Sequence, residues 1–181
     1  LARVVARWTG RTNVLVRLEG HGREDVFDDL DLTRTVGWFT SIYPVSLSAQ
    51  AQLDSSIKVI KEQLRAVPNK GIGYGLLRYL GSDDSRQVLD NLPQGEIVFN
   101  YLGQFDGSFD GGEQEGLFVP SGDGSGAEQS GEAPLGNWLE INGQVYAGEL
   151  KLNWSFSQQM FDEATVQRLA DDYATELKAL I

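Results

Sequence analysis

Cysteine is absent from this chain of 181 residues, so it has no disulfide framework and no thiolate metal site. It contains one histidine, which excludes a metal site built from several imidazoles. No apolar run is long enough to span a bilayer, and no charged-then-apolar signal segment stands at the start. These absences favour a cytoplasmic protein and give no reason to expect a membrane partner.

Positive charge is the scarcer kind. The chain has 15 lysines and arginines against 26 aspartates and glutamates, for a net charge of −11. An acidic surface repels phosphate backbones, so nucleic acid is not an expected partner. With 181 residues, of which 41% are hydrophobic, the chain is long enough for one domain with a real core. It shows neither an internal repeat nor a second domain.

Hydrophobic spacing predicts a sheet covered by helices. A first helix runs from Leu1 to Trp8 and ends at Thr9-Gly10. Because Leu1 stands in mid-helix with no cap before it, we expect the chain to be a piece of a longer one. Further spacing predicts strands over 14–18, 34–45, 96–105, 139–141 and 150–156, and helices over 53–67, 76–80 and 162–180. The predicted fold class is α/β, a mixed sheet with helices on it.

Two of these elements carry more specific predictions. Residues 34–45 are rich in β-branched and aromatic residues and predict a buried strand that Pro44 stops. Trp38 and Phe39 are then core residues rather than ligand contacts. Further on, Asn142-Gly143 predicts a two-residue hairpin turn.

Three stretches predict loops. The acidic residues 25–31 lack the EF-hand pattern, which favours a solvated loop over a calcium site. The glycines of 68–75 have neither the Lys-Ser/Thr pair nor the spacing of a phosphate-binding loop, so they predict a structural turn. Residues 106–136 are rich in Gly, Ser, Asp and Glu and predict a long, mobile loop.

Four ionisable side chains follow the strand 14–18, interleaved with two glycines: Glu19, His21, Arg23 and Glu24. Groups of this kind are costly to desolvate at a buried strand end unless they pair or act on something. One interpretation is a structural ion-pair cluster of Glu19, Arg23 and Glu24, with His21 a structural histidine. The other is a functional site built on the strand end.

Two polar residues, Asn100 and Tyr101, interrupt the apolar run 96–105. Buried Asn and Tyr side chains need hydrogen-bond partners. Since neighbouring residues of a strand point to opposite faces, only one of the two can face a given site.

Four blocks together resemble the motifs of one family, the epimerization domains of nonribosomal peptide synthetases. They are Glu19-Gly-His-Gly-Arg-Glu24, Arg34-Thr-Val-Gly-Trp-Phe-Thr40 with Tyr43-Pro44, Pro68-Asn-Lys-Gly-Ile-Gly-Tyr-Gly75 and Phe99-Asn-Tyr-Leu-Gly-Gln104. Their order and spacing both match, across nearly the whole chain. They favour epimerization domains over the related condensation domains, whose equivalent blocks differ.

The resemblance implies a chloramphenicol-acetyltransferase-like fold with two lobes and an active site between them. Residues 1–181 would be the C-terminal lobe, since the His-His-x-x-x-Asp-Gly motif of the N-terminal lobe is absent here. The implied reaction inverts Cα of an aminoacyl or peptidyl thioester carried on the phosphopantetheine of a peptidyl carrier domain. The implied partners are the N-terminal lobe and that carrier domain. The resemblance implies no metal and no directly bound cofactor.

The resemblance also assigns roles to residues. Glu19 would be the proton-transfer group of this lobe, facing a histidine of the other lobe. Tyr101 and Asn100 would be active-site residues. Tyr101 would donate a hydrogen bond to an enolate oxygen or relay a proton, and Asn100 would orient the thioester or support the site. Arg23 would either pair with Glu19 or serve as structural support, and His21 has no assigned role. Two alternatives stay open: a condensation-type domain that forms amides, and a non-catalytic lobe that docks a carrier domain.

Overall fold

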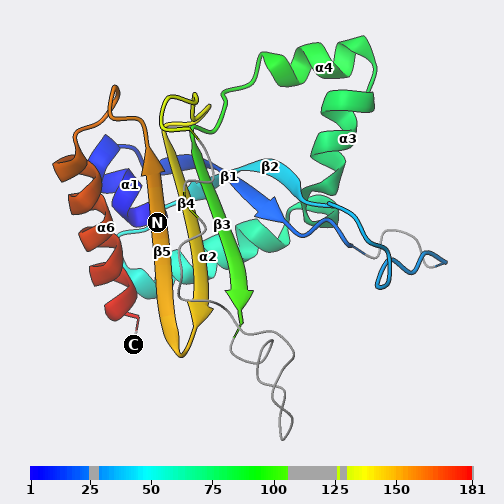
Figure 1. Cartoon of the computed structure of the whole chain (residues 1–181). Coiled ribbons are helices and arrows are strands. Elements are labelled where there is room, and N and C mark those ends of the chain that lie inside the picture. Colours follow the sequence, from blue (N-terminus) through cyan, green and yellow to red (C-terminus); the bar gives the residue numbers. More distant parts are fainter. Residues whose placement is uncertain (25–28, 106–125, 127–129, 181) are drawn as a thin grey trace, which may run out of the picture.

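A computed structural model of the chain contains one five-stranded sheet with helices packed on it (Figure 1). It describes residues 1–24, 29–105, 126 and 130–180. The strands are β1 (Asn13–Gly20), β2 (Ser41–Ser48), β3 (Ile97–Gln104), β4 (Leu139–Tyr146) and β5 (Glu149–Phe156). The helices are α1 (Ala2–Thr9), α2 (Leu53–Arg65), the 3₁₀ turn η1 (Pro68–Gly71), α3 (Ile72–Leu80), α4 (Asp83–Asp90) and α6 (Glu163–Lys178). Among these helices, none is both long and apolar enough to cross a membrane.

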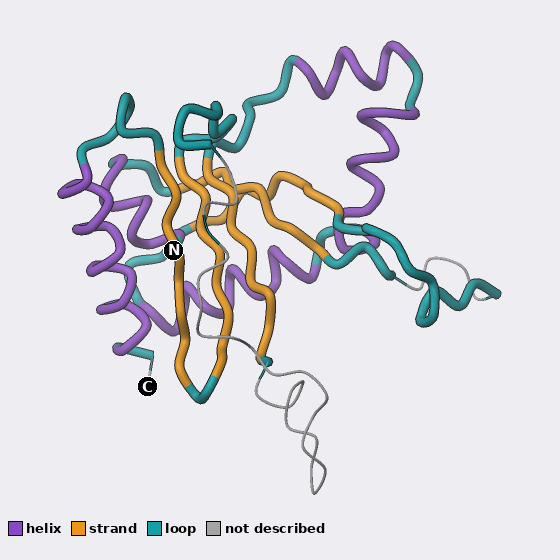
Figure 2. Tube along the Cα trace, viewed as in Figure 1, coloured by secondary structure: helices purple, strands orange, loops and turns teal. Residues whose placement is uncertain are grey.

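The sheet is mixed, with strand order β2-β1-β3-β4-β5 (Figure 2). β1 pairs antiparallel with β2 and parallel with β3. β4 pairs parallel with β3 and antiparallel with β5. The predicted α/β class, a mixed sheet with helices, is therefore confirmed.

One face of the sheet is covered by α1, α2 and α6 and holds the core. Figure 1 shows α2 crossing behind the strands, with α1 and α6 beside it. The fully buried strand residues Val16, Leu139 and Ile141 all point to this side. They belong to one core with three apolar residues of α6: Val166, Leu169 and Tyr173. The apolar spacing that predicted these helices and strands is thus the spacing of one shared core.

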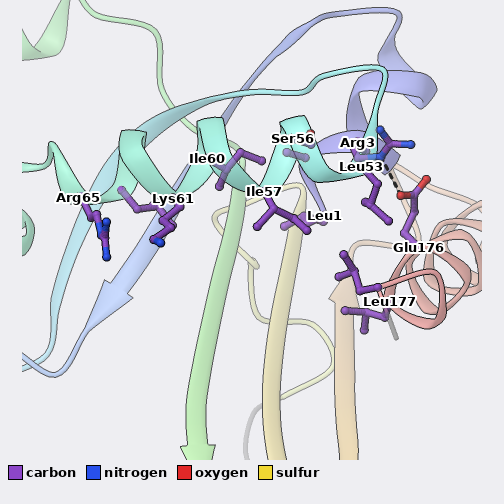
Figure 3. Close-up of a pocket in the computed structure, with 13 residues that line it drawn as sticks. Leu1, Arg3, Leu53, Ser56, Ile57, Ile60, Lys61, Arg65, Glu176 and Leu177 are labelled. Atoms are coloured by element: carbon purple, nitrogen blue, oxygen red, sulfur yellow. Dashed lines mark hydrogen bonds and ion pairs between the residues drawn. The ribbon is translucent and has the colours of Figure 1, made fainter.

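A groove of about 490 Å³ lies on the helical side, between α2 and the C-terminal part of α6 (Figure 3). Its walls are apolar and include Leu53, Ile60 and Leu177. At one end Arg3 Nε donates to Glu176 Oε2 over 2.8 Å, and Arg7 also pairs with Glu176. These ion pairs join α1 to α6.

Helices α3 and α4 form an arm that extends away from the sheet (Figure 1). Apolar spacing predicted only the end of α3, and α4 was not predicted. A local signal for α4 exists, because Ser82 accepts a hydrogen bond from the N–H of Ser85 and two aspartates occupy the first turn.

The prediction of a buried strand over 34–45 is wrong. The strand begins at Ser41, and Trp38 is 90% exposed. Pro44 does not stop the strand but lies within β2, an edge strand, where a proline leaves no central ladder bond unmade. The prediction failed because it relied on β-branched and aromatic content. That content shows that a segment has apolar side chains, but not whether another part of the chain packs over them. Phe39 is half-buried, and its ring contacts Arg23 rather than the core.

The predicted turn at Asn142-Gly143 is also wrong. Both residues lie inside β4, and the hairpin turns at Ala147-Gly148, which have φ values of 53° and 72°. A Cβ at Gly143 would come 2.7 Å from Cδ2 of Leu152, the end of a side chain that packs over this position. The predicted loop 106–136 lies largely outside the described residues, as do residues 25–28 of the acidic stretch.

Candidate functional site

The first two motif blocks, residues 19–24 and 34–44, contact each other beyond the end of β1. Gly22 has φ +68°, and a Cβ at this position would come 1.5 Å from the carbonyl oxygen of Phe39. Only glycine permits this approach of two backbones. The segment after β1 and the segment before β2 are therefore locked together.

The third block joins the same corner through Gly71. A Cβ there would come 2.1 Å from the ring of Tyr43, and φ is +86°. Just before it, Asn69 and Lys70 adopt left-handed conformations, with φ values of 45° and 49°. Such backbone strain at non-glycine residues is often found at functional sites.

Glu24 is the centre of the ion pairs at this corner. Its side chain is 11% exposed and lies 2.6 Å from Nζ of Lys70 and 3.3 Å from Nε2 of His21. The N–H of Arg23 donates to Nδ1 of His21 over 3.0 Å. The predicted ion-pair cluster of Glu19, Arg23 and Glu24 is therefore not what forms: Glu24 pairs with His21 and Lys70 instead. Lys70 was not foreseen as a partner of Glu24, because it is far away in the sequence.

Arg23 supports the loop before β2 rather than pairing with Glu19. Its guanidinium donates to the carbonyl oxygens of Leu32 (2.7 Å) and Gly37 (3.3 Å). It also lies over the ring of Phe39, 4.2 Å from the centroid. Of the two roles that the resemblance left open for Arg23, the contacts favour structural support.

Glu19 and Asn100 lie on the same face of the sheet, the one opposite α1, α2 and α6. The pairing of β1 with β3 ends at Leu18 and Phe99, and Glu19 and Asn100 are the next residues of the two strands. Leu18 and Phe99 pack against the core, which turns Glu19 and Asn100 to the other face. We call this other face the open face, because no helix of the described residues covers it over β3, β4 and β5 (Figure 1).

Tyr101 lies on the opposite side from Glu19. The ring of Tyr101 passes close to the space above Gly143, beside Leu152, a residue packed against the core. Its side chain is 52% exposed. The structure therefore puts Asn100 on the same face as Glu19 and Tyr101 on the other face, and a direct role for Tyr101 stays a prediction from the resemblance alone.

The Glu19 carboxyl has a raised pKa. Partial burial disfavours its charged form, and the negative charge of Glu140 adds to the effect. A carboxyl group that holds a proton more firmly than usual, on an accessible sheet face, is suited to proton transfer. Among the described residues, no group of three or more His, Cys, Asp or Glu side chains is arranged to hold a metal ion.

Comparison with known sequences identifies the family. A family model described as Condensation domain matches residues 1–181. Surfactin synthase subunit 1 of Bacillus subtilis (strain 168) is 42% identical over 176 residues, covering 96% of this chain and 5% of that protein. Tyrocidine synthase 1 of Brevibacillus parabrevis is 39% identical over 186 residues, covering 97% of this chain and 17% of that protein. The chain thus spans a small part of these relatives.

Comparison with solved structures agrees. The epimerization domain from the third module of tyrocidine synthetase B has a TM-score of 0.84 and 39% identity, covering 98% of this chain and 39% of that one. A second structure, described as the molecular basis for condensation domain-mediated chain release from the enacyloxin polyketide synthase, has a TM-score of 0.61 and 15% identity. The match covers 98% of this chain and 34% of that one, and it shows a shared fold alone. With the family model matched along residues 1–181, this chain belongs to the condensation domain family of nonribosomal peptide synthetases.

Proposed function

We propose that residues 1–181 form the C-terminal lobe of an epimerization domain. The domain would invert Cα, from L to D, of an aminoacyl or peptidyl thioester on the phosphopantetheine arm of a carrier domain. The observation that carries the proposal is the Glu19 carboxyl, which has a raised pKa and lies on the same open face as Asn100. Similarity to a solved epimerization domain, at 39% identity, supports it.

The chemistry needs two proton-transfer groups. A base removes the Cα proton, and the electron pair of that bond moves into the thioester to form an enolate. A second group then returns a proton to the opposite face of the planar carbon, so one group gains a proton and the other loses one. A raised pKa makes the carboxyl of Glu19 hold its proton more firmly than an ordinary carboxyl, so that it can serve as the donor, and its carboxylate can accept a proton in the reverse direction.

The second group would come from the N-terminal lobe. His21, the one histidine of this chain, is exposed and held by Glu24 and the Arg23 backbone, so it is a poor partner for Glu19. The reaction proposed here uses no metal and no directly bound cofactor, because the thioester itself acidifies Cα. We expect the lobe to be inactive alone, since one face of the enolate would then have no proton-transfer group.

The test uses the complete synthetase module that contains this chain. With an L-aminoacyl carrier domain in D₂O, mass spectrometry should show deuterium at Cα, and chiral analysis should show the D isomer. A positioned acid–base group contributes roughly 10²- to 10⁴-fold, and Glu19→Gln should lower the exchange rate by that factor. Glu62→Gln is the matched control, because Glu62 is exposed on α2 and pairs with Arg65 of the same helix.

Each rival function has its own signature in the same assay. An amide product without inversion at Cα would identify a condensation-type domain. Binding of the loaded carrier domain without exchange or product would identify a docking lobe. Unchanged exchange in Glu19→Gln would remove Glu19 from the mechanism.

A further inference from the structure

The face that holds Glu19 and Asn100 carries further polar residues across the sheet. Asn100 is paired in register with Asn142 of β4, and Asn142 with Asn153 of β5. We call these four residues, Glu19, Asn100, Asn142 and Asn153, the polar row. Asparagine is depleted in strands, so three aligned asparagines on one sheet face are not explained by strand propensity.

Asn142 is held in place by a neighbouring carboxylate. Its Nδ2 donates to Oε1 of Glu140 over 3.0 Å, and both side chains are half-buried. The two residues are separated by one position in β4, so they share the open face. Because the amide nitrogen faces Glu140, the amide oxygen Oδ1 points away from it. A charge-assisted bond of this kind fixes the amide plane of Asn142.

The charged groups on the open face come from three strands. β1 contributes Arg17, β4 contributes Glu140, and β5 contributes Glu149 and Lys151. The flanking residues of β2, Ile42 and Pro44, and those of β3, Val98 and Asn100, carry no charge. Helix α3, which packs on β2, brings the phenol of Tyr74 to the Pro44 side of this face. Glu149 pairs with Tyr146 at the hairpin end of β5, so Glu140, which pairs with Val98 of β3, is the carboxylate nearer to Glu19 in the strand register.

We propose that Glu140 and Asn142 are a positioning pair for the reaction at Glu19. Glu140 orients the Asn142 amide toward the thioester-bearing group bound over the polar row, and its charge disfavours a second carboxylate at Glu19. The inference rests on the proposed function, and it adds two residues that lie outside the four sequence motifs. Glu140 acts through Asn142 and Glu19 and does not touch the reacting carbon.

Three variants separate orientation from charge in the deuterium-exchange assay of the complete module. Glu140→Gln keeps a hydrogen-bond acceptor for Asn142 and removes the charge. It should move the Glu19-dependent limb of the pH–rate profile to lower pH, with the maximal rate nearly kept. Asn142→Ala should lower kcat by roughly 10- to 100-fold without moving that limb, the size expected for misplacing a bound group.

Glu140→Ala removes both the charge and the hydrogen-bond acceptor of Asn142. It should therefore move the pH–rate profile to lower pH and also lower kcat. In kcat, the double variant Glu140→Ala with Asn142→Ala should lose no more than the worse single variant, since the two residues act as a unit. Glu62→Gln again serves as the control. Urea unfolding of each variant reports whether it folds, and the pH profile reads out charge independently of any loss in folded fraction.

The outcomes separate the inference from the function. Absence of Cα exchange in the unmodified module overturns the proposed function itself. Exchange that depends on Glu19, with an unshifted pH profile in Glu140→Gln or an additive double variant, overturns the positioning pair and leaves the function standing. A shifted profile with non-additive losses supports it.

Discussion

The two faces of the sheet differ in the residues they present: one is apolar and buried, and the other is largely polar and open. On the face covered by α1, α2 and α6, strand residues such as Val16 and Ile141 are fully buried and apolar. On the open face, the same strands present the polar row and Glu140. The first face stabilises the fold through burial of many apolar side chains, whereas on the second Val98 is buried among mostly polar neighbours. Stability and chemistry are therefore carried by alternate residues of the same strands.

The largest effect on stability is expected on the covered face. Ile141 is 0% exposed, and Ile141→Ala should cost about 2–5 kcal/mol in the free energy of unfolding, from lost burial and the cavity left behind. Asn153→Ala, on the open face of the adjacent strand, should change it by no more than about 0.5 kcal/mol. Urea unfolding measures both. Equal losses would show that the open face also supports the fold.

The second largest effect on stability is expected where the segment after β1 packs against the segment before β2. Gly22→Ala forces a Cβ into the Phe39 carbonyl at positive φ and should cost about 1–3 kcal/mol. Gly10 has the same φ of +68° but open space around its Cα, so Gly10→Ala should cost about 1 kcal/mol or less. Thermal unfolding compares the pair. Similar losses would mean that backbone conformation alone, and not the packing of the two loops, sets the cost.

The ion pairs of Glu176 should give a pH-dependent effect on the covered side. Burial pushes the pKa of Glu176 up, but hydrogen bonds and charges from Arg3 and Arg7 outweigh this and hold the pKa below its usual value. Such a group stabilises the fold above its unfolded pKa, near 4.5, and this stability is lost as the pH falls. Glu176→Gln should cost about 1–2 kcal/mol at pH 7. The difference should vanish at acid pH, and a constant difference would contradict this linkage.

The smallest effect on stability is expected at Glu19. Its pKa is raised in the folded protein, so its contribution to stability is present at low pH and is lost as the pH rises through the folded pKa. Glu19→Gln should therefore match or exceed the unmodified chain in stability at pH 7, by about 0.5 kcal/mol or less. Chemical unfolding at pH 4 and pH 7 checks the trend. A less stable variant at pH 7 would give Glu19 a structural role.

Much of the fold could be predicted because it follows from local spacing. The helices over 53–67 and 162–180 and the strands over 14–18 and 96–105 appear near the expected positions. Their apolar residues repeat with the period of the element. The segment 34–40 could not be predicted in this way, because its apolar residues Val36 and Trp38 are almost fully exposed.

The candidate site was predicted in part. Glu19 and Asn100 turn to the same face of the sheet, and Arg23 contacts the loop before β2 and not Glu19. Their catalytic roles stay predictions from the resemblance. Tyr101 does not join them. Glu140 and Asn142 were missed, because their link to Glu19 runs through strand register and not through any motif.

The sequence by itself determined the elements, the motif blocks and the rule that Asn100 and Tyr101 must diverge, since these depend on neighbouring residues. Only the tertiary structure decided which face each of them takes. That choice depends on where α1, α2 and α6 pack, and these helices come from distant parts of the chain. The same long-range packing placed Lys70 beside Glu24 and aligned Asn142 with Asn100, which no local pattern encodes.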